Sequence, residues 1–273
     1  MTALLLLLLL GAALPVHAHP VAPADSASPP ALTWLSQVGL DQHVSEFIPL
    51  DLPFADETGK PVLLRDYFGN KPVILTLVYY DCPNLCTLVL DGLLRTLRTL
   101  SLSVGQDFHV LTVSINPDNP ASLAAVKQAH YLREYGRASA AQDWHFLTGP
   151  PESIQPLTQA VGFRYTYDAV HKEYAHAAGL IVLTPQGQLA RYFYGVEYAP
   201  RDVRLALVEA AQYKIGSPID QLLLLCYHYD PHSGAYTLGV LRALRLAGLV
   251  TMVALGTGIG IMVHRERRRR VST

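Results

Sequence analysis

The feature that most constrains this chain is an apolar run that ends in two closely spaced cysteines. Residues 73–80 read Val-Ile-Leu-Thr-Leu-Val-Tyr-Tyr, and after Asp81 the segment Cys82-Pro-Asn-Leu-Cys86 follows. A continuous apolar stretch of this length that leads into a helical pattern predicts a buried β-strand followed by a helix. We therefore expect Cys82 near the start of the helix and Cys86 one turn inside it, with both sulfur atoms facing the same way.

The local chemistry of this turn favours sulfur that binds metal or reacts. Pro83 suits the first helical position, because the N–H group that it lacks would be unpaired there. The unpaired N–H groups at the start of a helix favour a thiolate over a thiol. Two adjacent thiolates form a soft-metal site or a redox couple, and a plain disulfide or two buried core thiols are the structural alternatives. Asp81 could tune the thiolates, accept a hydrogen bond, or serve as a cap or turn residue.

Strands and helices alternate along the body of the chain. The pattern predicts strands at 73–80, 108–115, 144–147, 179–183 and 189–194, and helices from Cys86 to Leu100, at 121–135, 151–161 and 200–213, with a short helix earlier at 31–44. Asn119 and Pro120 are predicted as the cap and first-turn residue of the helix at 121–135. The alternation predicts an α/β fold, and a thioredoxin-like central sheet flanked by helices is the simplest one with a cysteine pair after its first central strand.

Both ends of the chain are apolar in ways that suggest a membrane. Residues 1–14 are almost wholly apolar but too short to span a bilayer comfortably, and Val16-His-Ala18 offers small residues for signal peptidase. We therefore expect a secretory signal cleaved after Ala18, with an uncleaved anchor as the alternative. Near the other end, residues 246–263 carry no charge, and at 1.5 Å per residue they would extend roughly 27 Å, about the thickness of the hydrocarbon core. Five arginines follow within 265–270, which predicts a C-terminal transmembrane helix with a cytoplasmic tail.

The composition excludes one class of partner. Only 16% of the 273 residues are charged and the net charge is −1, so no basic surface for nucleic acid is expected.

The predicted organisation is a signal peptide (1–18), a flexible lead-in with the short helix (19–44), a thioredoxin-like domain (45–215), a linker (216–238), a transmembrane helix (239–263) and a basic tail (264–273). This places the domain outside the inner membrane of a bacterial cell, facing the periplasm or the exterior.

A third ligand near the cysteine pair would favour a metal site over a redox couple. Two thiolates alone hold Cu(I), and an added nitrogen ligand also accommodates Cu(II). Among the eleven histidines, His176 is the best candidate, because a loop that enters a neighbouring strand of such a sheet can reach the cysteine turn. His171 is the rival.

These residues resemble a known family. Tyr79-Tyr-Asp-Cys-Pro-Asn-Leu-Cys86 after a long strand, Ser114-Ile-Asn-Pro117 after the next strand, and His176 nine residues before Pro185-Gln-Gly187 together resemble the Sco/SenC family of copper-binding thioredoxin-fold proteins. The resemblance covers about residues 45–213. It implies that Cys82, Cys86 and His176 bind copper and that the protein helps to assemble the copper centre of cytochrome c oxidase.

The chain departs from the family pattern at several positions. Ala175 and Asn116 stand where the family often has Asp, so any carboxylate around the ligands must come from elsewhere. The C-terminal span, with its preceding Cys/His segment, resembles a bacterial subgroup of the family rather than the members anchored at the N-terminus. In that segment Cys226 and His228 are alternate residues that would share one side of an extended strand. They are candidates for a second copper site, a contact with the first site, or a thiol-exchange group, and the alternative is a free thiol and a solvent histidine in a linker.

Two functions from different classes follow. The first is a copper chaperone that passes its metal to the copper-centre subunit of cytochrome c oxidase or another cuproprotein. The second is a thiol-disulfide oxidoreductase, with Cys82 and Cys86 as the redox-active pair, that reduces the cysteines of such a partner. Three residues separate the two cysteines, whereas familiar thioredoxin-type catalysts have two. The cysteine pair therefore does not by itself identify the protein as an enzyme, and a metal chaperone is the favoured interpretation.

Overall fold

The computed structural model describes residues 37–82, 85–212, 227–230, 235–238 and 248–262. The expected signal peptide, Cys226 and the basic tail lie outside these residues. Residues 31–36 of the expected short helix also lie outside them, and the described remainder contains strand β1 (Gly39–Leu40) instead of a helix. That part of the prediction is wrong, because Gly39 and Leu40 pair with a distant strand that a local pattern cannot reveal.

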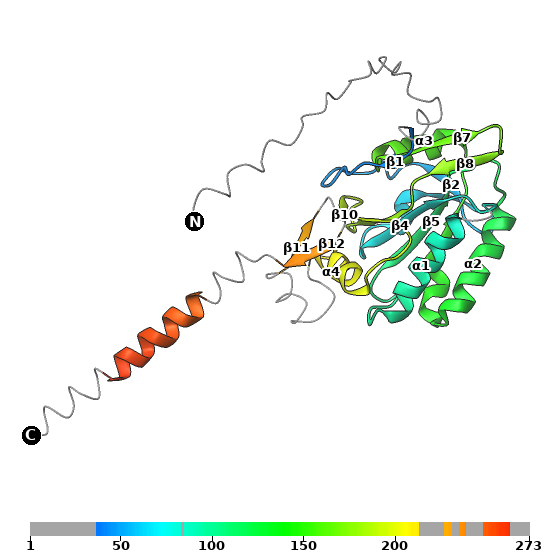
Figure 1. The fold of residues 1–273 in the computed structure, drawn as a ribbon. Helices are drawn as coiled ribbons and strands as arrows, with labels where there is room; N and C mark the ends of the chain where they lie inside the picture. The colour runs from blue at the N-terminus through cyan, green and yellow to red at the C-terminus, as the bar shows by residue number, and fades with distance from the viewer. Residues whose placement is uncertain (1–36, 83–84, 213–226, 231–234, 239–247, 263–273) are drawn as a thin grey trace, which may run out of the picture. The chain divides into compact units, whose positions relative to one another are not determined.

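A five-stranded mixed sheet forms the centre of the molecule (Figure 1). Its strand order is β10 (Leu189–Tyr194), β9 (Gly179–Leu183), β4 (Val73–Val78), β5 (His109–Ser114) and β6 (Trp144–Leu147). Strands β4, β5 and β6 run parallel, while β9 is antiparallel to both β4 and β10. Every residue of β4 is buried, as expected for a strand covered on both faces. The sheet confirms the predicted α/β, thioredoxin-like fold.

Helices cover this sheet and bury its apolar surface. They are α1 (Leu85–Thr99), α2 (Ala121–Tyr135), α3 (Pro151–Ala160) and α4 (Pro200–Ala210). Figure 1 shows α1 and α2 lying side by side against the sheet, and α1 contacts both α2 and α4. The face of α1 that carries Leu90, Leu93 and Leu97 is buried, whereas Leu88 is exposed. The predicted helix from Cys86 to Leu100 is therefore confirmed as α1, and it buries one apolar face.

Smaller sheets complete the described part of the chain. A three-stranded sheet has the order β1, β7 (Phe163–Asp168) and β8 (Glu173–His176), and a two-stranded one consists of β2 (Pro53–Ala55) and β3 (Pro61–Leu63). The linker contains a hairpin of β11 (Tyr227–Asp230) and β12 (Ala235–Leu238), in which His228 pairs with Thr237. The sequence pattern does not predict the pairing of β7 with β8, in which His176 lies opposite Tyr165.

Residues 248–262 form a helix within the expected transmembrane segment, and its side chains are exposed. None of the helices in the described residues has both the length and the apolarity needed to cross a membrane. Both ends of the expected span, at 246–247 and 263, lie outside the described part of the chain.

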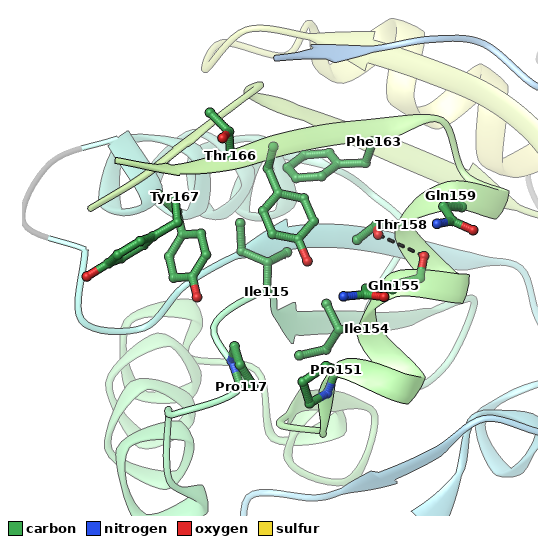
Figure 2. Close-up of a pocket in the computed structure, with 12 residues that line it drawn as sticks. Ile115, Pro117, Pro151, Ile154, Gln155, Thr158, Gln159, Phe163, Thr166 and Tyr167 are labelled. Carbon is green, nitrogen blue, oxygen red and sulfur yellow. Dashed lines mark hydrogen bonds between the residues drawn. The ribbon is translucent and has the colours of Figure 1, made fainter. Parts of the chain in front are cut away.

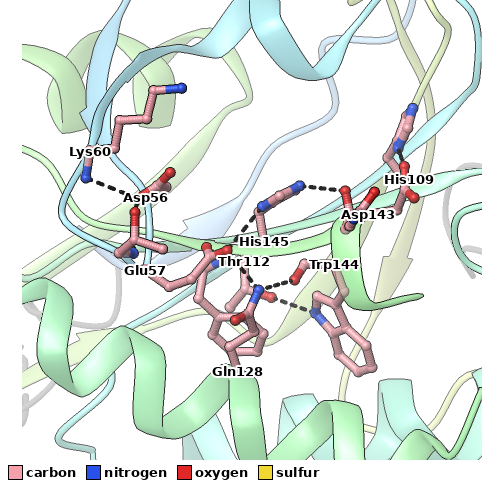
Figure 3. A network of polar contacts seen from close by, with 12 residues as sticks. Asp56, Glu57, Lys60, His109, Thr112, Gln128, Asp143, Trp144 and His145 are labelled. Atoms are coloured by element: carbon pink, nitrogen blue, oxygen red, sulfur yellow. Dashed lines mark hydrogen bonds and ion pairs between the residues drawn. The ribbon is translucent and has the colours of Figure 1, made fainter. Parts of the chain in front are cut away.

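A half-buried ion pair between Glu57 and His145 ties the β2–β3 turn to the edge of the central sheet (Figure 3). Nδ1 of His145 lies 3.2 Å from a Glu57 carboxylate oxygen, and Nε2 lies 2.9 Å from the Gln142 carbonyl, so both ring nitrogens face acceptors. Burial is the largest single effect and would lower the pKa of His145, but the Glu57 carboxylate, the Gln142 carbonyl and the charge of Asp143 together raise it. Burial alone would raise the pKa of Glu57, but hydrogen bonds from His145 and the Phe146 N–H lower it.

We expect this pair to stabilise the fold most between about pH 5 and pH 6.5. The raised pKa of His145 gives stability that is complete below its unfolded value of 6.5 and is lost as the pH rises through the folded value. The lowered pKa of Glu57 gives stability that is present above 4.5 and is lost as the pH falls. His145→Gln should therefore lower the free energy of unfolding by about 1–3 kcal/mol near pH 6, and by less at pH 8.5.

Urea unfolding of the parent and the variant at both pH values measures this difference. The exposed His130 provides the matched control, because His130→Gln should lower stability little at either pH. A destabilisation by His145→Gln that is as large at pH 8.5 as at pH 6 would show that the ion pair is not its source.

Candidate metal centre

The first ligand, Cys82, follows β4 through a tight turn. The Cys82 N–H group donates to the Tyr79 carbonyl at 3.3 Å, which closes a four-residue turn with Tyr80 and Asp81 at its centre. Cys82 is buried, with 8% of its surface exposed. The end of a buried parallel strand thus delivers a sulfur atom to the edge of the sheet, as the sequence predicts.

The second cysteine lies in the first turn of α1. The described part of this helix begins at Leu85, and Cys86 lies near that point. Its N–H group donates to Sγ of Cys82 at 3.4 Å, and its own Sγ accepts the Tyr79 N–H at 3.3 Å. Both cysteines are present as thiols.

His176 ends β8, and it reaches the cysteines through the pairing of β8 with β7. In that register His176 lies opposite Tyr165. Its Nε2 atom lies 3.1 Å from Sγ of Cys86, and its Nδ1 atom lies 2.7 Å from the Ala177 carbonyl. A carbonyl only accepts, so Nδ1 carries the proton and Nε2 is left with a lone pair directed at Cys86.

The three side chains form one buried group whose ligand atoms all lie within 4.8 Å of one another. Two ligands on opposite sides of one ion, each at about 2.3 Å, would be roughly 4.6 Å apart, so a single ion fits among them. Two sulfur atoms and one imidazole nitrogen are the donors that copper prefers in both of its common oxidation states. The residues predicted as ligands are therefore brought together in a site that fits copper.

The rival histidine does not join this group. His171 lies in the turn between β7 and β8, where its Nδ1 is paired with Asp168 at 2.6 Å and 73% of its side chain is exposed. His228 lies on β11, and Cys226 is outside the described residues.

Aromatic rings enclose His176. The ring of Tyr79 meets the imidazole edge-on with centroids 5.7 Å apart, and that of Phe163 lies 5.9 Å away. Tyr174 packs in turn against Tyr79 at 5.6 Å. Tyr79 therefore packs directly against the imidazole ring of His176. The signal that could have revealed the enclosure is the alternation of aromatic residues along 163–167, which marks a half-buried strand.

A pocket of about 480 Å³ shares Phe163 and Tyr174 with these aromatic contacts, and Figure 2 shows the residues that line it. It is lined by Ile115, Pro117, Pro151, Ile154, Gln155, Thr158, Gln159, Phe163, Tyr165, Thr166, Tyr167 and Tyr174. None of these side chains is charged at neutral pH. Phe163 is shared between the pocket and the surroundings of His176, so the pocket lies beside the centre and outside the ligand set.

Burial keeps Cys86 protonated when no metal is bound. Desolvation is the largest effect and raises the pKa of its thiol well above the ordinary value, although the Tyr79 N–H acts in the opposite direction. The prediction that the helix start favours a thiolate is therefore wrong for Cys86, because the burial of the sulfur outweighs the N–H groups around it. Metal must displace the thiol proton when it binds.

We expect Cys86 of the reduced, metal-free protein to react slowly with iodoacetamide near neutral pH, because only the thiolate attacks. Its alkylation rate should still be rising at about pH 9, above the ordinary thiol pKa. Peptide mass spectrometry at a series of pH values measures the rate, and the same chain in denaturant is the control. A rate that levels off below about pH 8 would show a stabilised thiolate instead.

The fold and the ligand set together define a class: a thioredoxin-like domain with a buried Cys₂His copper-type centre. The model of the SCO1/SenC family matches residues 46–211, and the chain belongs to this family. A comparison with curated proteins gave no match.

Three solved structures illustrate the similarity. A putative electron transfer protein from Aquifex aeolicus VF5 is 26% identical, with a TM-score of 0.54 over 63% of this chain and 96% of that one. A putative electron transport protein from the same organism is 27% identical, with a TM-score of 0.50 over 61% of this chain and 98% of that one. A SCO1/SenC family lipoprotein from Bacillus anthracis str. Ames shares the fold at 13% identity, with a TM-score of 0.50 over 65% of this chain and 100% of that one.

Proposed function

We propose that this protein is a copper chaperone that binds one copper ion through Cys82, Cys86 and His176 and delivers it to the copper centre of cytochrome c oxidase. The observation that carries the proposal is the convergence of the three ligand atoms within 4.8 Å, with the unprotonated Nε2 directed at Cys86. Membership of the SCO1/SenC family supports the choice of metal and of receiving protein. Another cuproprotein that accepts copper by ligand exchange is the alternative partner.

The three ligands are all buried, to slightly different depths. Cys86 is the least exposed ligand, at 3%, while Cys82 and His176 keep 8% and 6% of their surface. An incoming ligand of the partner would therefore reach the ion beside Cys82 or His176. The bond between the ion and the Cys86 sulfur would be the last to break. Both thiols must be reduced before the metal is loaded, so thiol-disulfide chemistry accompanies this function.

We expect His176→Ala to weaken Cu(II) binding much more than Cu(I) binding. Loss of an outer-shell partner alone typically costs 10- to 100-fold in affinity, so loss of this ligand should cost Cu(II) more than about 100-fold. Cu(I) should still be held by the two sulfurs, because soft thiolates suffice for it. Anaerobic titration with each ion, together with the sulfur-to-copper charge-transfer band of Cu(II), measures both effects.

His171→Ala is the matched control, because this exposed histidine is five residues away and outside the ligand group. Unchanged Cu(II) affinity in His176→Ala would eliminate His176 as a ligand. If the parent binds neither ion tightly, the chaperone function fails. Turnover of a disulfide substrate that Cys82→Ser abolishes would then support the oxidoreductase.

Cys226 and His228 are proposed as a second, weaker copper site in the linker. His228 lies on β11 two positions after Cys226, and alternate residues of an extended segment share one side. The same titration of the full chain tests this assignment. Two equivalents of copper that fall to one in Cys226→Ser would support it, and one equivalent in both chains would contradict it.

We also propose that a C-terminal helix tethers the domain to the bacterial inner membrane, with the domain in the periplasm. The uncharged stretch at 246–263 and the five arginines that follow it support this orientation. The full chain should fractionate with inner membranes and be digested by protease added to spheroplasts, and deletion of 246–273 should release it. Its mature N-terminus should be His19. A full chain that fractionates as a soluble protein would contradict the tether.

A further inference from the structure

The turn that carries Cys82 is fixed on one side by a buried tyrosine. Tyr80 is one of its two central residues, and its hydroxyl oxygen lies 2.8 Å from the carbonyl oxygens of both Thr112 and Leu147, which share its one proton. Only 2% of Tyr80 is exposed. The turn is thereby anchored to β5 and β6, but this contact alone leaves Asp81, the residue next to Cys82, unrestrained.

Asn119 holds both central residues of this turn. Its Oδ1 atom accepts the Tyr80 N–H at 2.8 Å and the Ser114 hydroxyl at 2.8 Å. Its Nδ2 atom donates to the Asp81 carboxylate at 2.8 Å, and Asn116 makes a longer contact of 3.4 Å with the same oxygen. Asn119 is buried, with 6% of its surface exposed.

This use of Asn119 differs from the expected one. The sequence predicts that the residue caps α2, but Pro120 occupies the N-cap position and no side chain caps that helix. The Asn119 side chain turns instead toward the turn after β4. Because two donors meet its Oδ1, the amide has one orientation, and its Nδ2 must face Asp81.

We propose that Asn119 is a positioning residue for copper exchange: through Tyr80 and Asp81 it holds Cys82 in the place where its sulfur meets Cys86 and the metal. The inference rests on the proposed copper function. Cys82 Sγ lies 3.4 Å from the Cys86 N–H, and a turn released from Asn119 would let this sulfur move away. Neither Asn119 nor Asp81 belongs to the ligand group.

The hydrogen bond between Asn119 and Asp81 can be tested by swapping the amide and the carboxylate between the two positions. Asn119→Asp keeps the acceptor for Tyr80 and Ser114 but places a second carboxylate against Asp81, so the two side chains repel. Asp81→Asn keeps an acceptor for Nδ2 of Asn119 as a weaker, uncharged bond. In the double variant the amide introduced at position 81 could donate to the carboxylate introduced at position 119, which restores the bond with its direction reversed.

We expect Asn119→Asp to weaken Cu(II) binding by about 10- to 100-fold, within the range typical of outer-shell partners, and to shift its charge-transfer band. Asp81→Asn should weaken binding only about threefold, because a neutral hydrogen bond replaces a charge-assisted one. The double variant should recover most of the loss caused by Asn119→Asp. Asn70→Asp, an added charge at an exposed position before β4, should bind as the parent does.

A second readout needs no copper. The Cys82 and Cys86 thiols exchange with oxidised glutathione to give the protein disulfide and two reduced glutathiones, and the equilibrium constant depends on how the sulfurs are held. Asn119→Asp should change this constant at least about fivefold, and the double variant should restore it. Thermal unfolding of each variant ensures that all are folded at the temperature of the measurement.

The outcomes separate this inference from the copper function. A parent that fails to bind copper contradicts the copper function, and the glutathione equilibrium then still tests the positioning role. If the parent binds copper but the double variant stays as weak as Asn119→Asp, the Asn119–Asp81 bond does not position Cys82. Parent-like binding and exchange in Asn119→Asp would overturn the inference directly.

Discussion

The antiparallel pairing of β9 with β4 is the constraint on which the centre depends. In this register Val73 faces Leu183, so the beginning of β9 lies beside the end of β4. The residues just before β9 therefore meet the residues just after β4, which brings His176 to Cys86 across 90 positions of sequence. A parallel β9 would have carried the histidine to the opposite edge of the sheet.

This dependence explains what the sequence could and could not predict. Cys82 and Cys86 follow from a local pattern, a buried strand and a helix, and the structure places Cys82 after the strand and Cys86 in the helix, as expected. The prediction of His176 rests on its position before a strand and on the family resemblance. The pairing that delivers it, Tyr165 with His176 in the β7–β8 ladder, is set by distant residues and leaves a weak local pattern.

The burial that encloses the ligands also sets the chemistry of the metal-free centre. A thiolate at Cys86 without a cation would be an isolated buried charge, which is costly, so the raised pKa of its thiol keeps it neutral. The protonated Nδ1 of His176 leaves Nε2 able to accept from that thiol. The same two atoms become ligands when copper replaces the proton, so little rearrangement is needed around Tyr79 and Phe163.

The departures from the family pattern can be understood through Asp81. The resemblance implies that relatives often carry Asp at the positions of Asn116 and Ala175, whereas here Asp81 is the carboxylate beside Cys82. Asn116 Nδ2 lies 3.4 Å from that carboxylate, and Asn119 Nδ2 lies 2.8 Å from it. A carboxylate at position 116 would set two negative charges against each other, while an amide can donate to Asp81. An amide at position 116 is therefore compatible with a carboxylate at position 81.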